Sequence, residues 1–384
     1  MGKSSSKNTG KIVCFHLFND FSGSPTVLKG ILQGLLNKGE SIDLVTSRGG
    51  VLDKLEHEGL KRLKFDYSFT KNFLATALRF FYAQTVMMIA ASRYIFNRKS
   101  IFYINTILPV GPAMIGKLIG KKVIYHYHEN AYVKSGLYRI LAKMMEKLAN
   151  EIICVSSYQA SFLKRSKNVT VVPNSLEEEF LCKIKPNPQS AFERRNILLI
   201  SSLKEYKGVK EFLKLSEFLN EYKFTLVLNA NGNEILQWVK DNKIKVSDNC
   251  KIYPRTDDVA FFYNNASLLL NLSNSDFVVE TFGMTVLEAM SAGLPVIVPP
   301  VGGVAEMVEE GVTGFKISSK DLLSISSKIK DIFSNKDKYI KLSQNALSLS
   351  KNYNGETAII SILNIIKKAD RQEPKWKSKD NTLI

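Results

Sequence analysis

The chain has 384 residues, of which 45% are hydrophobic and 23% are charged, which excludes a disordered chain and suffices for two domains with separate cores. The formal net charge is +17, and it is divided unevenly. Residues 1–175 contain 25 Lys and Arg against 10 Asp and Glu, or +15, whereas residues 176–384 contain 28 against 26, or +2. A basic half beside a near-neutral half predicts that one part of the molecule meets a polyanion, either an anionic membrane or a nucleic acid.

The first residues, MGKSSSKNTG (1–10), are polar, and we expect a disordered tail there. Gly2 and Ser6 are in register with the N-myristoylation pattern, so a myristoylated tail is an open alternative. The start of the chain lacks the pattern of a secretory signal, and we therefore expect a cytoplasmic protein.

Short apolar runs rich in β-branched residues alternate with helical patterns along the whole chain. Such runs are typical of parallel strands that are buried on both faces and joined by crossover helices. The sequence therefore predicts an α/β protein with two doubly wound domains. The expected strands are 12–15, 42–46, 101–104, 123–127, 152–155 and 169–172 in the first half, then 197–201, 225–228, 268–272, 295–298 and 314–317.

Residues 73–96, FLATALRFFYAQTVMMIAASRYIF, form the most hydrophobic stretch. Arg79, Gln84 and Arg93 interrupt it, so it falls short of the about 20 apolar residues that a transmembrane helix needs. Two interpretations remain. The preferred one is a helix packed on a sheet, and the other is an interfacial helix whose basic residues face lipid phosphates, namely Arg79, Arg93, Arg98 and Lys99.

The domain boundary is predicted at the sequence VVPNS, because Pro173 ends a strand and Asn174 favours a turn. We expect a first domain over 11–175, a polar linker over 176–195 and a second domain over 196–352.

The last part of the chain predicts one helix and a tail. Apolar residues at helical spacing, with Ile359, Leu363 and Ile366 on one face, predict a C-terminal helix over 353–370. The charged residues 371–384 predict a flexible tail.

Residues 271–308 contain the largest group of candidate ligand-binding residues. The expected strand that begins this segment is followed by a loop with Glu280, and Gly283 opens a helix. Carboxylates and backbone N–H groups thus converge at a helix N-terminus beyond the carboxyl end of a parallel strand, where open α/β sheets bind ligands. Glu288 puts a second carboxylate in the second turn of that helix, so the two acids can hold different parts of one extended ligand.

The run ETFGMTVLEAMSAGLPVIV (280–298), followed by VGGVAE (301–306), resembles the signature of retaining glycosyltransferases of the GT-B fold in the large family 4. The resemblance implies two Rossmann-like domains that face a central cleft: an acceptor-binding N-terminal domain, a nucleotide-sugar-binding C-terminal domain, and a C-terminal helix that packs near the hinge. It also implies that Glu280 holds hydroxyls of the donor sugar and that Glu288 binds the ribose. Backbone groups would meet the sugar and diphosphate at Phe282, Gly283, Met284 and Thr285.

The segment ISSLKEYKGVKEFLKL (200–215) resembles the family's phosphate-binding loop and helix, with Lys207 expected at the diphosphate. Ser202 stands where the family commonly has Arg, and serine brings no charge. Phosphate binding is therefore expected to depend on Lys207, helix dipoles or Lys204, and the departure puts activity in doubt. Arg255 falls in the segment where the family contacts the base.

In the first half, a loop between the first strand and the next helix presents Gly23 and Ser24, which suit a phosphate or sugar at a helix N-terminus. An ordinary strand-to-helix turn is the alternative.

His126 and His128 end a strand of the first half. The family resemblance gives His128 an active-site role. The other interpretation is a hydrogen-bonded histidine of the cleft wall.

The resemblance implies a metal-independent retaining transferase with catalytic His128, Lys207 and Glu280 and no cofactor. The expected donor is a UDP-sugar, ahead of GDP-mannose. The expected acceptor is a glycan or lipid-linked hydroxyl in surface polysaccharide, lipopolysaccharide or glycolipid synthesis. The basic half then predicts peripheral binding to the cytoplasmic face of an anionic membrane and no nucleic acid. The alternatives are a catalytically weak GT-B paralogue and a nucleotide-sugar epimerase.

Overall fold

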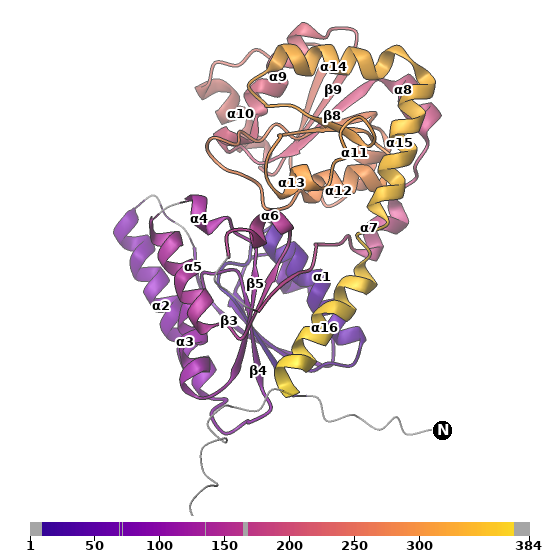
Figure 1. The fold of residues 1–384 in the computed structure, drawn as a ribbon. Coiled ribbons are helices and arrows are strands. Elements are labelled where there is room, and N and C mark those ends of the chain that lie inside the picture. Colours follow the sequence, from indigo (N-terminus) through magenta and orange to yellow (C-terminus); the bar gives the residue numbers. More distant parts are fainter. Residues whose placement is uncertain (1–9, 69, 71, 135, 164–167, 372–384) are drawn as a thin grey trace, which may run out of the picture. The chain divides into compact units, whose positions relative to one another are not determined.

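The computed structural model describes residues 10–68, 70, 72–134, 136–163 and 168–371 (Figure 1). The chain forms two units. One comprises the chain up to Val155, Ala160–Val172 and the chain from Glu356, and the other comprises Ser156–Gln159 and Pro173–Gly355. The expected tails at 1–10 and 371–384, with the myristoylation pattern, lie almost wholly outside the described residues.

The first unit is built on a seven-stranded parallel sheet in the order β3-β2-β1-β4-β5-β6-β7. Its strands are β1 (Ile12–His16), β2 (Ile42–Ser47), β3 (Leu60–Phe65), β4 (Ile101–Asn105), β5 (Lys122–Tyr127), β6 (Glu151–Cys154) and β7 (Val169–Val171). Its helices are α1 (Gly23–Asn37), a 3₁₀ turn (Val51–Lys54), α2 (Phe73–Ser92), α3 (Val110–Leu118), α4 (Ala131–Lys134), α5 (Gly136–Leu148) and α16 (Gly355–Arg371).

The C-terminal helix α16 belongs to the first unit although it follows the second in sequence. A Cβ atom at Gly34 of α1 would come within 2.6 Å of the Ile359 side chain, so the glycine permits close packing of the two helices. Lys38–Glu356 and Lys368–Glu151 ion pairs, each 2.9 Å long, flank that contact.

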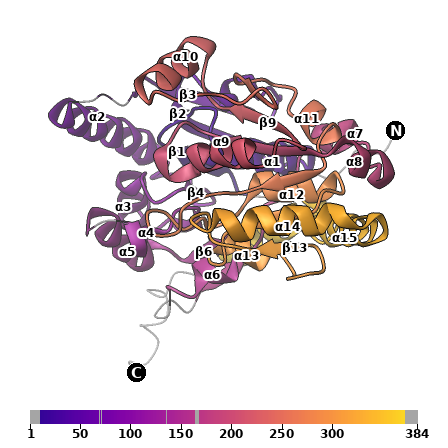
Figure 2. The same cartoon turned by 90° about the horizontal axis from the view of Figure 1, so that it is seen from above.

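The second unit has a six-stranded parallel sheet in the order β10-β9-β8-β11-β12-β13. Its strands are β8 (Asn196–Ser201), β9 (Lys223–Leu228), β10 (Cys250–Tyr253), β11 (Leu268–Leu270), β12 (Val296–Val298) and β13 (Gly314–Lys316). Figure 2 shows α14 and α15 in one row, with α12 beside α15. The helices are α6 (Ser157–Ala160), α7 (Glu178–Lys183), α8 (Pro188–Arg194), a 3₁₀ turn (Glu205–Lys207), α9 (Val209–Phe218), α10 (Gly232–Asp241), α11 (Ala260–Asn264), α12 (Met284–Ser291), α13 (Gly303–Glu306), α14 (Leu322–Ser334) and α15 (Lys336–Ser350).

Every strand that the apolar pattern predicts is present, within a few residues at its ends. The pattern misses β3 and β10, which are the outer strands of their sheets. Each pairs on one side only and keeps polar side chains exposed, so neither reads as a continuous apolar run. The stretch 176–195, expected as a linker, contains the two short helices α7 and α8 and is grouped with the second unit.

Candidate functional site

The strand order of each sheet reverses at one point, between β1 and β4 in the first unit and between β8 and β11 in the second. Crossovers leave such a point in opposite directions, which opens a crevice at the carboxyl ends of the strands where ligands bind. Of the predicted residues, Gly23 follows β1, Ser202 and Lys207 follow β8, and Glu280 follows β11, whereas Arg255 follows the outer strand β10.

In the second unit, Glu280 and Lys207 form an ion pair. Lys207 Nζ donates to Glu280 Oε1 over 2.5 Å, and the side chains are 27% and 13% exposed respectively. Ser273 Oγ donates to the same oxygen at 2.5 Å, and Asn271 Nδ2 donates to Oε2 at 3.1 Å. The carboxylate thus has three hydrogen-bond donors at the end of β11.

Opposing effects act on the pKa of each partner in this pair. Burial pushes the pKa of Glu280 up, but the charge of Lys207 and the hydrogen bonds outweigh it and leave that pKa below its ordinary value. Burial likewise pushes the pKa of Lys207 down, and Glu280 outweighs it, so the Lys207 pKa is raised. Both groups therefore stay charged at neutral pH.

Glycine is required at Gly208, the residue after Lys207. Its φ is +75°, and a Cβ atom there would lie 2.3 Å from the Leu272 backbone oxygen. Only glycine therefore lets the loop that carries Lys207 approach the end of β11. A hydrogen bond from Asn274 N to Tyr206 O, 2.7 Å long, joins the same two loops.

The Gly302–Gly303 pair supports the loop of Glu280 from the other side. Gly303 N donates to Glu280 O over 2.8 Å. A Cβ atom at Gly303 would lie 1.8 Å from Thr281 O, and one at Gly302, where φ is +103°, would lie 2.6 Å from Glu280 O. The two glycines let this backbone contact form, which explains their place beside the first acid.

Helix α12 begins at the predicted position, with Gly283 as its N-cap and no side chain bonded to its first N–H groups. Met284 and Thr285 form its partly exposed first turn, whereas Phe282 is buried with its ring 5.9 Å from that of Tyr353. A Cβ atom at Gly283 would lie 2.7 Å from Val304, so glycine is needed here too. These backbone donors and the positive end of the helix dipole suit an anion.

Glu288 lies in the second turn of α12 and accepts a hydrogen bond from Tyr263 Oη at 2.5 Å. Burial raises the pKa of Glu288 to about 7, although the Tyr263 hydrogen bond works against the rise. The second acid of the pair therefore keeps its proton to a higher pH than Glu280 does. The protonated carboxyl can donate and accept hydrogen bonds and the ionised form can accept them, so either form can pair with ligand hydroxyls.

Two other predicted residues of this unit lie on loops. Ser202 directly follows β8 and is partly exposed. Arg255 follows β10 with its side chain exposed, and its backbone N donates to Ala230 O at 2.9 Å.

In the first unit, three histidines meet near the reversal point. His16 ends β1, and His126 and His128 lie at the end of β5, with the last two rings 4.2 Å apart. Asn105, at the end of β4, contacts two of them: its Nδ2 lies 3.0 Å from His16 Nδ1, and its Oδ1 lies 3.0 Å from His128 Nε2.

The hydrogen bonds fix the protonation of two rings. His16 Nε2 lies 2.8 Å from Phe18 O and must donate to it, which leaves Nδ1 as an acceptor. Asn105 therefore turns its NH₂ to His16 and its oxygen to His128, so His128 Nε2 is a donor. Burial lowers the pKa of His16 to about 4 and of His126 to about 3, and burial with the neighbouring rings lowers the pKa of His128, so all three are neutral at pH 7.

The residue after Asn105 has a strained backbone. Thr106 has φ +67°, a left-handed conformation that is unfavourable for a β-branched residue, and it is 4% exposed. Its N donates to His126 O at 2.9 Å, which holds the chain in this turn. Such strain is typical of functional sites, where the surrounding structure positions a neighbouring side chain.

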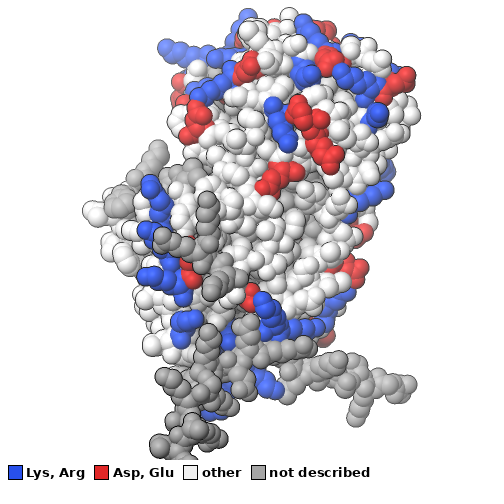
Figure 3. Space-filling view, in the orientation of Figure 1, with Lys and Arg blue, Asp and Glu red and all other residues white. Residues whose placement is uncertain are grey.

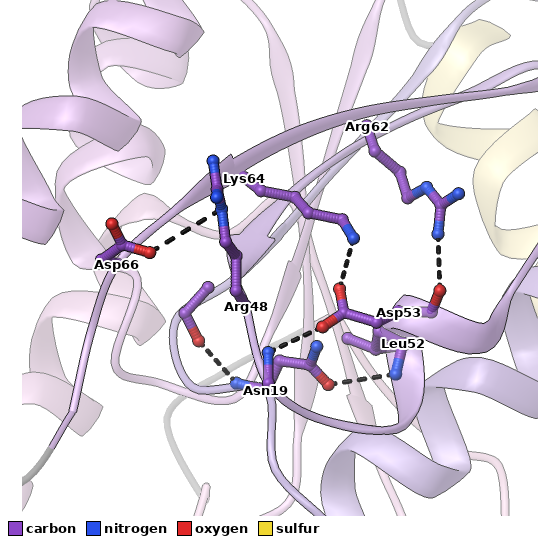
Figure 4. Close-up of polar contacts among 9 residues, drawn as sticks. Asn19, Arg48, Leu52, Asp53, Arg62, Lys64 and Asp66 are labelled. Atoms are coloured by element: carbon purple, nitrogen blue, oxygen red, sulfur yellow. Dashed lines mark hydrogen bonds and ion pairs between the residues drawn. The ribbon is translucent and has the colours of Figure 1, made fainter.

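The loop that carries Gly23 and Ser24 is anchored through Asn19 (Figure 4). Asn19 N donates to Ser47 Oγ at 2.9 Å, and its Oδ1 accepts from Leu52 N at 3.0 Å. Asn19 Nδ2 is buried and has no hydrogen-bond partner among the described residues. A ligand oxygen would satisfy this donor.

The same loop places an acid at the start of α1. Asp20 Oδ1 accepts from Ser22 N at 3.0 Å and from Ser22 Oγ at 2.5 Å. A Cβ atom at Gly23 would meet open space, so nothing within the chain requires glycine there. Asp20 opposes a phosphate at this helix end, and hydroxyl groups suit it better.

The sequence did not single out Asn105, Thr106, Ser273, Asn271 or Tyr263. They are single polar residues within apolar or loop segments. Only Asn105 and Asn271 have a sequence feature that could have indicated a site, because each stands at the carboxyl end of an apolar strand. Among the described residues, no group of three or more His, Cys, Asp or Glu side chains, the three histidines of the first unit included, is arranged so that it could hold a metal ion.

The family model described as glycosyl transferases group 1 matches residues 183–348. An uncharacterised glycosyltransferase of Haemophilus influenzae is 22% identical over 62% of this chain and 67% of its own length. The N-acetyl-alpha-D-glucosaminyl L-malate synthase of Bacillus anthracis is 27% identical over 43% of this chain, which spans only 44% of that relative.

Solved structures show the same fold over nearly the whole chain. Anabaena HepE, solved in complex with UDP-glucose, aligns with a TM-score of 0.76 and 17% identity over 94% of this chain and 100% of that one. The sucrose-phosphate synthase of Thermosynechococcus elongatus aligns with a TM-score of 0.74 and 16% identity over 94% and 98%. The two parallel-sheet units therefore form the GT-B fold.

Proposed function

We propose that the chain, whose residues 183–348 match the family model of the glycosyl transferases group 1, moves a sugar from a nucleotide-sugar donor to an acceptor hydroxyl, with retention at the anomeric carbon. The observation that carries the proposal is the Glu280–Lys207 pair beside the uncapped N-terminus of α12. The Glu280 carboxylate suits the hydroxyls of a sugar. Lys207 and the backbone N–H groups of α12 suit phosphates, so the site matches both ends of a sugar diphosphate.

Lys207 and the first turn of α12 would stabilise the diphosphate as negative charge grows on it and the glycosidic bond breaks. The departing phosphate oxygen would then take the proton of the acceptor hydroxyl on the same face of the sugar, which gives retention without an enzyme nucleophile. Glu280 would hold the sugar hydroxyls and keep Lys207 in place. We propose that this charge stabilisation replaces a metal.

Glu288 is proposed to bind the ribose hydroxyls, and Arg255 and Ser202 to lie along the nucleotide. A UDP-sugar is the preferred donor, because HepE, of the same fold, was solved with UDP-glucose. His128, neutral and oriented by Asn105, is proposed to orient a substrate hydroxyl. Gly23, Ser24 and the buried Asn19 amide would receive hydroxyls at the start of α1.

The proposed acceptor is a lipid-linked or glycan hydroxyl in surface polysaccharide or glycolipid synthesis, reached from the cytoplasmic face of a membrane. The +15 charge of residues 1–175 supports this proposal, because lipid-linked acceptors lie among anionic head groups.

The test is turnover of labelled UDP- and GDP-sugars by the purified chain. We expect release or transfer of one sugar, and Lys207→Met should lower the rate about 10²- to 10³-fold, as loss of one stabilising group does. Lys214→Met, which removes an exposed lysine of α9, is the matched control and should leave the rate unchanged.

Other outcomes separate the alternatives. Donor binding without transfer would indicate a catalytically weak paralogue, the alternative that Ser202 in place of Arg supports. Recovery of an epimerised nucleotide sugar would indicate an epimerase. A folded wild type that binds no nucleotide sugar would contradict the proposal.

A further inference from the structure

Helix α2 carries an apolar stripe that the described residues of the first unit leave exposed. Five large side chains on it are each more than half exposed, at the spacing of one helix face: Leu74, Leu78, Phe81, Tyr82 and Ile89. The stripe continues past the helix end to Ile95 and Phe96, the latter 93% exposed.

The opposite face of α2 anchors the helix to its unit. Ala83, Met87 and Ala90 are buried in the core cluster of the first unit. Gln84 Nε2 donates to Leu108 O at 2.9 Å, and Gln84 Oε1 accepts from Gly111 N at 2.8 Å. The sequence predicted too short an apolar run for a membrane span, but Leu74–Ser92 is long and apolar enough to cross a membrane by length and composition. The contacts of Ala83, Gln84 and Met87 instead hold α2 against the core of its unit.

Neighbouring helices extend the exposed apolar surface. Helix α3 lies against α2 and α5 lies against α3, as both views show (Figures 1 and 2). Met114 and Leu118 on α3 and Leu137 and Ile140 on α5 are exposed. We call the exposed apolar residues of these three helices the α2–α3–α5 surface. Scattered exposed apolar residues are ordinary, but this number on adjoining helices is typical of an interaction site.

Basic side chains outnumber acidic ones around this surface. Between Asp66 and Glu129 the sequence has no acidic residue and eight basic ones. Lys121 is buried, whereas six of the others are at least partly exposed: Arg79, Arg93, Arg98, Lys99, Lys117 and Lys122. Arg139, Lys143 and Lys147 are exposed on α5, whose single acid, Glu146, accepts a hydrogen bond from Tyr132 Oη. Figure 3 shows blue side chains along this side of the first unit beside uncharged white surface.

We propose that the α2–α3–α5 surface docks on an anionic lipid bilayer. Apolar side chains would enter the boundary between head groups and acyl chains, while the basic residues meet lipid phosphates. A nucleic acid would leave the exposed Leu and Phe residues in water. A second copy of the same surface would bring two basic faces together without acidic partners, which opposes a symmetric dimer.

The polar groups within the stripe are compatible with the head-group boundary. Thr85 Oγ1 donates to Phe81 O at 3.0 Å, and Ser92 Oγ donates to Ile89 O at 2.9 Å. Both hydroxyls are thus satisfied within the helix and lose little on leaving water. Tyr82 adds an amphipathic ring of the kind enriched at membrane interfaces.

Docking would bring the chain to the membrane that holds the lipid-linked acceptor of the proposed function. Docking itself does not depend on sugar transfer. The test is co-sedimentation of the full chain with phosphatidylcholine vesicles and with vesicles that also contain phosphatidylglycerol. We expect binding to the anionic vesicles that weakens with added salt. The double substitution Leu78→Glu, Phe81→Glu should weaken it about tenfold or more, because two anchors are replaced by anions.

The matched control is Leu236→Glu, Leu323→Glu, which adds the same charges at side chains of the second unit that are 70% and 81% exposed. It should bind close to the wild-type level. Arg98→Gln should weaken binding about fivefold, the usual effect of one basic residue near an anionic surface. Unchanged thermal melting of each variant shows that the fold is retained.

The proposal is overturned if the wild type does not sediment with anionic vesicles, or if the α2 double variant binds as well as its control. A wild-type dimer in solution that the α2 variant converts to a monomer, without vesicle binding, would identify a second copy as the partner instead. Donor turnover measured without vesicles reports on the transferase proposal separately, so the two can fail independently.

Discussion

At the scale of single residues, the ion pair with Glu280 reduces the net positive charge that Lys207 can offer to a diphosphate. The lysine must attract a diphosphate, but a carboxylate 2.5 Å away compensates its charge. Glu280 is therefore expected to serve the sugar rather than the phosphates.

Glu280→Gln should separate these roles. The amide keeps the shape of the side chain but removes a negative charge next to the diphosphate, so UDP should bind at least as tightly as to the wild type. Turnover of the donor should fall about 10²-fold or more, because the sugar is no longer held by a carboxylate. Calorimetry of UDP binding and a rate assay measure the two effects, and weaker UDP binding would argue against the assignment.

Glu288 gives a second residue-scale prediction. Its pKa in the folded chain, about 7, lies above the ordinary 4.5, so folding takes up a proton between these values and the unfolding free energy falls as pH rises through that window. Glu288→Gln removes the effect and should stabilise the chain by up to about 3 kcal/mol at pH 8 and little at pH 4.5. Urea unfolding at the two pH values checks this, and equal changes at both would contradict it.

At the scale of elements, glycines set how closely the site loops approach the strands. Gly208 has φ +75° and backbone atoms in the place of a Cβ, whereas Gly39 has φ +84° and open space there. Gly39→Ala should therefore cost about 1 kcal/mol of unfolding free energy through backbone strain alone. Gly208→Ala should cost at least about 2 kcal/mol more, because the loop must also move. Equal losses in urea unfolding would mean that the close approach is unimportant.

The apolar strands, the start of α12 and the two acids of the signature could be predicted because their patterns are local. The edge strands β3 and β10 could not, because their solvent-facing side chains hide the pattern. Asn105 and Tyr263 were missed for another reason: their partners are distant in sequence, and only the fold brings His128 and Glu288 to them. The pairing of Lys207 with Glu280 likewise depends on two loops meeting across neighbouring strands.

At the scale of the whole molecule, three buried neutral histidines make stability depend on pH. Their folded pKa values lie below the ordinary 6.5, so the unfolded chain binds more protons as pH falls through 6.5, and stability is lost in that direction. Glu288 acts in the opposite sense but is one group against three. The unfolding free energy should fall by about 3 kcal/mol between pH 7 and pH 5, and the fall should be larger in Glu288→Gln. Urea midpoints that do not change across this range would contradict the assigned protonation.

The basic and the near-neutral halves of the sequence belong largely to different units of the structure. Part of the basic excess of the first half, including Arg79, Arg93 and Arg139, is exposed on or next to the α2–α3–α5 surface, whereas the near-neutral second half contains the Lys207–Glu280 pair. Membrane docking and donor binding are thus assigned to different units and are testable with different variants.

The most direct test of the central claim is calorimetric titration of the purified chain with UDP-glucose and GDP-mannose. We predict saturable binding of one nucleotide sugar by the wild type and by Lys214→Met, and binding weakened at least about tenfold by Lys207→Met, which removes the cation at the diphosphate. Binding of equal strength in Lys207→Met and the wild type would contradict the assignment of the donor site.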